Sequence, residues 1–181
     1  MSTSLSNRVI SLADGVDRIV GAVCGVMIVG TIIVLLAVLG TNVVVRYALE
    51  QGGITWVSEI PEQLFPWMIA AGIILAVQHG AHIAVDVLFA LLGPAAGRVM
   101  AICIHLLVAV AYGVLFSVVL NVADIVSIEH SPLLQLSRSW GYYALAFAAG
   151  GTALGNLLIA LRVALIGIDG LPKASAEESP L

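Results

Sequence analysis

The fold is decided by residues 19–45, which read IVGAVCGVMIVGTIIVLLAVLGTNVVV and carry no ionisable group except the thiol of Cys24. A bilayer's hydrocarbon core is about 30 Å thick, and roughly 20 apolar helical residues cross it. Backbone amides cannot remain unpaired in lipid, so such a run must be helical. The chain therefore reads as an all-α membrane protein. Its four predicted transmembrane helices lie at about 19–45, 58–78, 95–123 and 139–166.

Composition and charge agree with a membrane protein. The 181 residues are 61% hydrophobic and 10% charged, and the mean hydropathy is +1.11, far above the values of soluble domains. Four spans and their connections fill most of this length, so we expect no soluble domain. The net charge of -4 comes without a basic patch, which argues against a nucleic-acid partner.

The seven lysine and arginine residues predict the orientation of the chain. A cytoplasmic N-terminus would leave Arg46 and Arg138 outside and the other five basic residues inside, and the reverse orientation would invert these numbers. Cytoplasmic loops carry the excess of basic residues, so both termini are predicted to be cytoplasmic. Residues 1–18 would then form a cytoplasmic N-terminal segment, and the polar residues 167–181 a disordered cytoplasmic tail.

The second predicted span brings two carboxylates to the membrane. Its apolar core, residues 64–77, would cover only about 21 Å at 1.5 Å per residue, so the span must include Glu59 and Glu62. These residues are three positions apart and share a helix face, and a carboxylate that faces lipid is costly. Arg46 is the expected counter-charge of Glu59. We expect Arg46, Trp56 and Glu59 to form a cluster that orients the first helix hairpin; the alternative is that they are ordinary interfacial polar residues.

Two pairs of glycines are spaced for close helix packing. Neighbouring helices can approach closely at Gly21-x-x-x-Gly25 and at Gly151-x-x-x-Gly155. Residues 83–92 are mostly apolar, include one acidic residue and are too short to cross the bilayer. A short amphipathic helix lying in the inner interface is therefore predicted there.

A different class of protein also has to be considered, because four histidines could ligate haem. A b-type membrane cytochrome needs axial histidines on facing helices inside the bilayer, and only His105 lies within a predicted span. A four-helix cytochrome b or quinone-linked membrane anchor is therefore the alternative hypothesis.

The span centres offer His105 alone as a midplane ionisable group, which predicts a membrane partner without a complete translocation path. No phosphate-binding loop, catalytic triad or metalloprotease motif occurs, so we expect neither an enzyme nor a bound cofactor.

Several motifs are more specific than membrane composition. They are Asn42-x3-Arg46-Tyr47, Trp56-x-x-Glu59 and Gly80-x-His82-Ile83-x-Val85-Asp86, in that order. This pattern resembles the small, four-helix membrane subunit (Q-type) of tripartite ATP-independent periplasmic (TRAP) transporters, and the similarity extends over nearly all of residues 19–165. The chain departs from the family at positions 58, often acidic, and 78 and 79, often basic, which here are Ser58, Gln78 and His79.

The resemblance implies a function. TRAP systems import organic acids with a sodium gradient: a soluble periplasmic binding protein captures the substrate, and a large membrane subunit holds the substrate and sodium sites. The small subunit would lie in the bacterial inner membrane, in contact with membrane lipid. It would brace the large permease subunit and contribute to the surface where the binding protein docks, without a cofactor of its own. The residues expected at its partner interfaces are Arg46, Tyr47, Trp56, Glu59, Glu62, His82 and Asp86.

Overall fold

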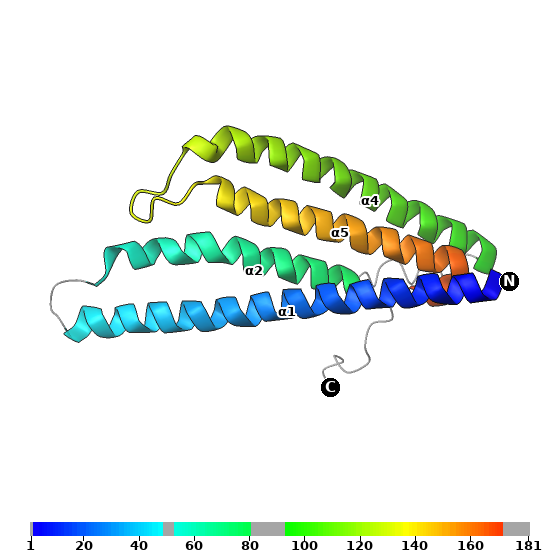
Figure 1. Cartoon of the computed structure of the whole chain (residues 1–181), viewed down its shortest axis with the longest axis horizontal. Coiled ribbons are helices and arrows are strands. Elements are labelled where there is room, and N and C mark those ends of the chain that lie inside the picture. Colours follow the sequence, from blue (N-terminus) through cyan, green and yellow to red (C-terminus); the bar gives the residue numbers. More distant parts are fainter. Residues whose placement is uncertain (1, 49–52, 81–92, 172–181) are drawn as a thin grey trace.

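The computed structural model describes residues 2–48, 53–80 and 93–171, and these residues are almost entirely helical (Figure 1). The prediction of an all-α protein with four membrane-spanning helices is confirmed, because four of the described helices are long and apolar enough to cross a bilayer. Short 3-10 helices η1, η2 and η3 flank them. The bounds are α1 Ser2–Ala48, η1 Thr55–Ser58, α2 Glu59–Gln78, α4 Pro94–Ile125, η2 Val126–Ile128, α5 Ser139–Ile166 and η3 Ile168–Gly170.

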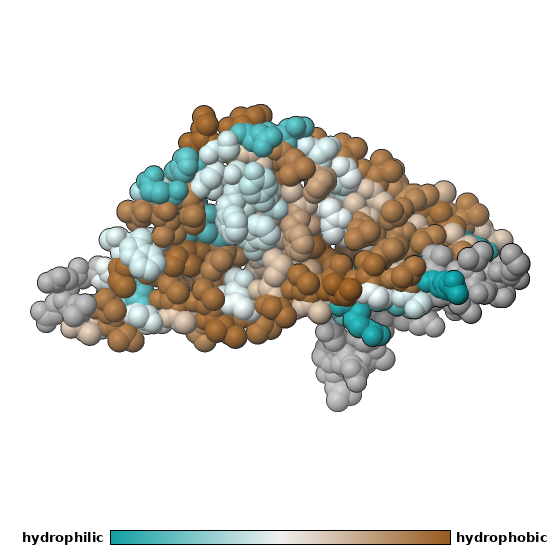
Figure 2. All heavy atoms as spheres, in the orientation of Figure 1, coloured by the Kyte–Doolittle hydropathy of each residue, from teal (hydrophilic) through white to brown (hydrophobic). Residues whose placement is uncertain are grey.

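The long helices lie side by side in the order α1, α2, α5, α4 (Figure 1). Helix α5 is central: half of the residues (50%) in its most apolar stretch are buried, against 22% in α2, 11% in α1 and 6% in α4. The outer helices α1 and α4 therefore keep most of their surface uncovered. Figure 2 shows the result, a face along the helices that is largely hydrophobic, as expected for a surface covered by lipid or by another membrane protein.

Glycines on α5 allow α2 to approach closely. A Cβ atom on Gly151 would lie 2.6 Å from Cγ1 of Ile74, and one on Gly155 would lie 3.2 Å from Cγ1 of Val77. The close packing predicted for this glycine pair is confirmed, because a larger residue at either position would press against a side chain of α2. The pair on α1 is only half confirmed. Gly21 lies against the side chain of Gln78, whereas Gly25 meets no described atom within 4 Å.

The structure adds detail at the two ends of the chain. Helix α1 begins at Ser2, so the residues of the predicted N-terminal segment from Ser2 on and the first predicted span lie on one helix. At the other end, Gly167 ends α5 with a positive φ of 84°, and Leu171 packs against a buried cluster that includes Val77 and Val163. The disordered tail therefore does not begin at residue 167. Residues 172–181 and the predicted interfacial helix at 83–92 lie outside the described residues.

Candidate functional site

The end of the bundle opposite the N-terminus carries the connection between α1 and α2 and the connection between α4 and α5, and we call it the loop-bearing end (Figure 1). One is the connection before α2, of which residues 53–58 are described, and the other comprises residues 126–138 between α4 and α5, here called the α4–α5 loop. Five of the sequence-predicted interface residues belong to this end: Arg46, Tyr47, Trp56, Glu59 and Glu62. The structure thus brings the predicted cluster to one region, but Glu59 bonds to the α4–α5 loop and not to Arg46.

Glu59 binds the α4–α5 loop. It is the first residue of α2 and is only 8% exposed. Its two carboxylate oxygens accept hydrogen bonds from the backbone N–H of Leu133, at 3.1 and 3.2 Å, and Oε2 accepts a third from the N–H of Leu134 at 2.9 Å. Hydrogen bonds to an ionised acceptor are about twice as strong as neutral ones. The carboxylate therefore fixes the loop to the first turn of α2.

The predicted ion pair between Arg46 and Glu59 is wrong. Within the described residues, Arg46 forms no ion pair with any carboxylate, and it is exposed. The reason lies in the order of the helices: α2 packs between α1 and α5, and Glu59 is satisfied by amides of the loop that leads into α5. Once these amides surround the carboxylate, a cation is not needed to offset its burial.

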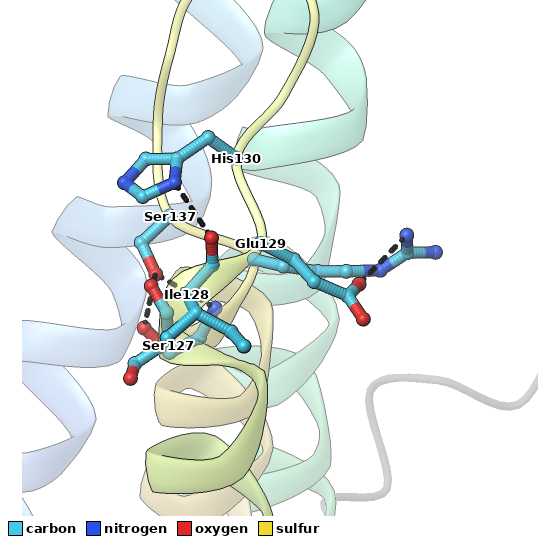
Figure 3. Close-up of polar contacts among 7 residues, drawn as sticks. Ser127, Ile128, Glu129, His130 and Ser137 are labelled. Atoms are coloured by element: carbon cyan, nitrogen blue, oxygen red, sulfur yellow. Dashed lines mark hydrogen bonds and ion pairs between the residues drawn. The ribbon is translucent and has the colours of Figure 1, made fainter.

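The α4–α5 loop is also ordered by its own hydrogen bonds, several of which Figure 3 shows. The Ser137 hydroxyl donates to the backbone oxygen of Ser127 at 3.0 Å and lies 2.7 Å from the hydroxyl of Ser139. The backbone N–H of Arg138 donates to the backbone oxygen of Glu129 at 2.8 Å, and their side chains form an exposed ion pair at 3.3 Å. These bonds order the base of the loop, and the bonds of Glu59 attach its tip to α2.

The tip of the loop closes by a second set of bonds. The N–H of Ser131 donates to the backbone oxygen of Leu136 at 2.9 Å, and the N–H of Gln135 donates back to the backbone oxygen of Ser131 at 3.2 Å. Gln135 takes a positive φ of 55°, a conformation that is uncommon for a residue other than glycine. The Ser131 hydroxyl accepts from the N–H of Leu136 at 3.2 Å. The loop is therefore a compact, hydrogen-bonded turn.

The other connection is fixed by Asn42 of α1. Its Oδ1 accepts a hydrogen bond from the backbone N–H of Ile54 at 2.7 Å, and Gly53, at φ +46°, leaves room for that side chain. This bond gives Asn42 a structural role within the first motif of the sequence. Trp56 is 45% exposed and Tyr47 is 82% exposed, so both aromatic side chains present much of their surface outward.

The remaining predicted interface residues take no part in the hydrogen bonds of Glu59 that the structure describes. Glu62 is exposed and lines a shallow, open groove between the first turns of α2 and α5, together with Arg138 and Tyr142. His82 and Asp86 lie outside the described residues.

The opposite end, here called the N-terminal end, is joined by side-chain ion pairs that the sequence did not predict. The Arg162 guanidinium of α5 lies 2.8 Å from a carboxylate oxygen of Asp14 and also pairs with Asp17, both on α1. Gln78 donates to the backbone oxygen of Asp17 at 3.1 Å. These contacts attach α1 to both α2 and α5. A possible signal was the i, i+3 spacing of the two aspartates, which places them on one helix face.

His105, the histidine inside a span, forms an interhelical bond. Its Nδ1 lies 2.8 Å from Oδ1 of Asn156 on α5, whose Nδ2 donates to the backbone oxygen of Thr152 at 2.9 Å. His79 ends α2 and His130 lies in the α4–α5 loop, at opposite ends of the bundle. The described histidines therefore offer no facing axial pair, and no group of three histidine, cysteine or acidic side chains among the described residues could hold a metal.

Comparison with known proteins identifies the family. Residues 35–165 match the family of "Tripartite ATP-independent periplasmic transporters, DctQ component". The chain belongs to the DctQ family. It is also 39% identical, over 137 residues, to "Uncharacterized protein y4mM" of Sinorhizobium fredii, a match that covers 76% of this chain and 25% of that protein. The chain thus spans about a quarter of the length of this relative. No solved structure matches the chain.

The DctQ match covers the loop-bearing end and the centre of the bundle more fully than the N-terminal end. It includes Asn42, Glu59, the α4–α5 loop and the His105–Asn156 pair, whereas Asp14 and Asp17 precede it. The DctQ family is a family of transporter components and not of enzymes. The chain is therefore a multi-pass membrane component of a TRAP transporter.

Proposed function

We propose that this DctQ component is the small membrane subunit of a sodium-driven, binding-protein-dependent transporter for organic acids, and that it braces the large permease subunit. The observation that carries the proposal is the uncovered surface of the outer helices, since only 11% and 6% of the most apolar stretches of α1 and α4 are buried. Helices that bury so little against their own chain have room for a large membrane partner.

The interior of the bundle supports a bracing role over transport by this chain alone. Ion-coupled transporters place ionisable groups or broken helices near the midplane. Here the histidine in the middle of the described spans, His105, has its Nδ1 bonded to Asn156. We therefore assign substrate and sodium binding to the large subunit and no cofactor to this chain.

The match to a family of periplasmic transporter components supports a bacterial inner-membrane location, and the distribution of arginines supports an orientation with both termini in the cytoplasm. Within the described residues, Arg8, Arg18, Arg98 and Arg162 lie at the N-terminal end, and Arg46 and Arg138 at the loop-bearing end. The excess of positive charge belongs on the cytoplasmic side. The loop-bearing end would then face the periplasm and the binding protein. A phosphatase fused after Lys173 should be inactive and one inserted at Gly53 active; the reverse pattern would overturn this orientation.

Reconstitution tests the proposed function. Proteoliposomes that contain this chain, the large subunit or both are supplied with the binding protein, substrate and an inward sodium gradient. Uptake should require both membrane subunits, and this chain alone should give none because its described spans contain no midplane ion site. Robust uptake by this chain alone, or full uptake by the large subunit without it, would contradict the proposal.

A further inference from the structure

We propose that the groove between the first turns of α2 and α5 binds the headgroup of a phospholipid that carries both a phosphate and a primary ammonium group, as phosphatidylethanolamine does. Arg138 binds the phosphate, and Glu62 accepts hydrogen bonds from the ammonium group. The inference goes beyond the proposed function and does not rest on it, because it requires only this chain and the bilayer around it.

Two opposite charges line the groove without neutralising each other. Glu62 lies in the first turn of α2, Arg138 directly precedes the first residue of α5, and both residues line the groove. Within the described residues, no ion pair joins them. Complementary charges select a partner and fix its orientation. The occupant that fits therefore carries a negative and a positive group.

The guanidinium of Arg138 has donors left for a phosphate. Its Nη1 pairs with Glu129 at 3.3 Å, and the two side chains are 68% and 56% exposed. An exposed pair of this kind contributes little to stability. A guanidinium carries five N–H donors in a planar fork, which matches the oxygens of a phosphate. Arg138 can therefore bind a phosphate without giving up Glu129.

The groove leads from the headgroup level into the apolar part of the bilayer. Trp140 and Tyr143 lie near the start of α5 and are 44% and 41% exposed, and tryptophan and tyrosine side chains of spanning helices gather at the membrane–water interface. Pro66 and Leu145 line the groove further along α2 and α5, toward the middle of the bundle. Charged groups thus come first and apolar side chains follow, which is the order of groups in a phospholipid.

The size of the groove and its acidic side restrict the headgroup. Its volume is about 270 Å³, below the range of about 300–1,000 Å³ for pockets that enclose a drug-sized ligand, and a Cβ atom on Gly141 would meet no described atom within 4 Å. The groove therefore takes a headgroup, and the acyl chains lie along the helices. A quaternary ammonium has no N–H to donate to Glu62. A primary ammonium group has three N–H donors and is the cation that the carboxylate selects.

Native mass spectrometry of the purified chain measures the binding. The chain is titrated with phosphatidylethanolamine and with phosphatidylcholine of the same acyl chains, which differ in the N–H donors of the headgroup. Phosphatidylethanolamine should bind about tenfold more tightly, as expected for a hydrogen bond to a charged group. Equal affinity for the two lipids would overturn the inference.

Substitution of the carboxylate assigns the preference to this groove. Glu62→Gln should remove most of the preference for phosphatidylethanolamine and should not weaken binding of phosphatidylglycerol, which has no ammonium group. Asp124→Asn is the matched control, because Asp124 is exposed at the same end and does not line the groove. A preference that survives Glu62→Gln, or that Asp124→Asn removes equally, would overturn the inference.

Two further variants test the phosphate contact and the space for the headgroup. Arg138→Gln should weaken binding of phosphatidylethanolamine and phosphatidylcholine alike, whereas Arg46→Gln, at an exposed position of the same end, should change neither. Gly141→Leu keeps both charges and fills the groove, so it should also weaken binding of both lipids. Full binding in Gly141→Leu would place the lipids elsewhere on the chain and overturn the inference.

The same titration of the complex with the large subunit separates a lipid from a protein occupant. The preference should persist in the complex. Its loss there would show that the large subunit covers the groove, which would overturn the inference and leave the proposed function standing. Failure of the two subunits to form a complex would overturn the proposed function, and the titration of the chain alone would still decide the inference.

Discussion

The two ends of the helix bundle are held by different kinds of bond. At the N-terminal end, a guanidinium from α5 pairs with two carboxylates of α1. At the loop-bearing end, one carboxylate of α2 binds backbone N–H groups of the α4–α5 loop. The first arrangement joins helices through flexible, partly exposed side chains, and the second fixes a loop through its main chain. The difference indicates that the loop-bearing end is built to keep one shape.

The bonds at the two ends fix α1 and the α4–α5 loop. The close packing of α2 against α5 in the middle of the bundle is therefore expected to contribute most to holding the helices together. Gly151→Leu should have the largest effect, because a side chain there would overlap Ile74. Overpacking of this kind costs about 3 kcal/mol, and thermal unfolding of the purified protein would measure it. Gly113→Leu is the control, since Gly113 lies on the exposed face of α4 and a Cβ atom there would meet no described atom within 4 Å. Equal stability of the two variants would show that the ends, not the middle, hold the bundle.

A smaller effect is expected at the N-terminal end. Arg162→Gln removes both ion pairs, of which the one to Asp14 has an exposed carboxylate, 57% accessible. The pair with the exposed Asp14 carboxylate contributes under about 1 kcal/mol and is screened by salt, whereas Arg162 and Asp17 are only 17% and 23% exposed and their pair is screened less. Amide exchange over residues 8–17 should speed up a few-fold in the variant, and high salt should have a smaller effect in the same direction on the wild type.

Arg18→Gln is the control for this prediction, because Arg18 is exposed and forms no ion pair within the described residues. If high salt also released the α4–α5 loop to the same extent, the distinction between the two ends would fail.

Much of the fold could be predicted because it depends on composition and spacing. The apolar stretches specify four spanning helices, and the Gly151–Gly155 spacing specifies a close helix contact, which the structure places against α2. Neither result needs knowledge of which helices are neighbours. The length of α1 was missed because residues 2–18 lie outside the apolar run, although they continue the same helix.

The partners of the charged residues could not be predicted in the same way. The sequence places Glu59 near Arg46 along the chain and suggests a salt bridge, but the carboxylate oxygens accept from backbone amides 74 and 75 positions away. Every residue except proline has such an amide, so the sequence carries no signal for it. Arg162 and Asp14 are likewise 148 positions apart and meet only once the helix order is known.

Amide hydrogen exchange at Leu133 and Leu134 tests the central claim, that Glu59 and not an ion pair with Arg46 orders the loop-bearing end. Three variants are compared with the wild type in the assembled complex. Glu59→Gln removes the charge that strengthens the three hydrogen bonds, so exchange of the two amides should rise by about tenfold or more. Glu62→Gln and Arg46→Gln should leave it unchanged. Unchanged exchange in Glu59→Gln, or an equal rise in Arg46→Gln, would contradict the account.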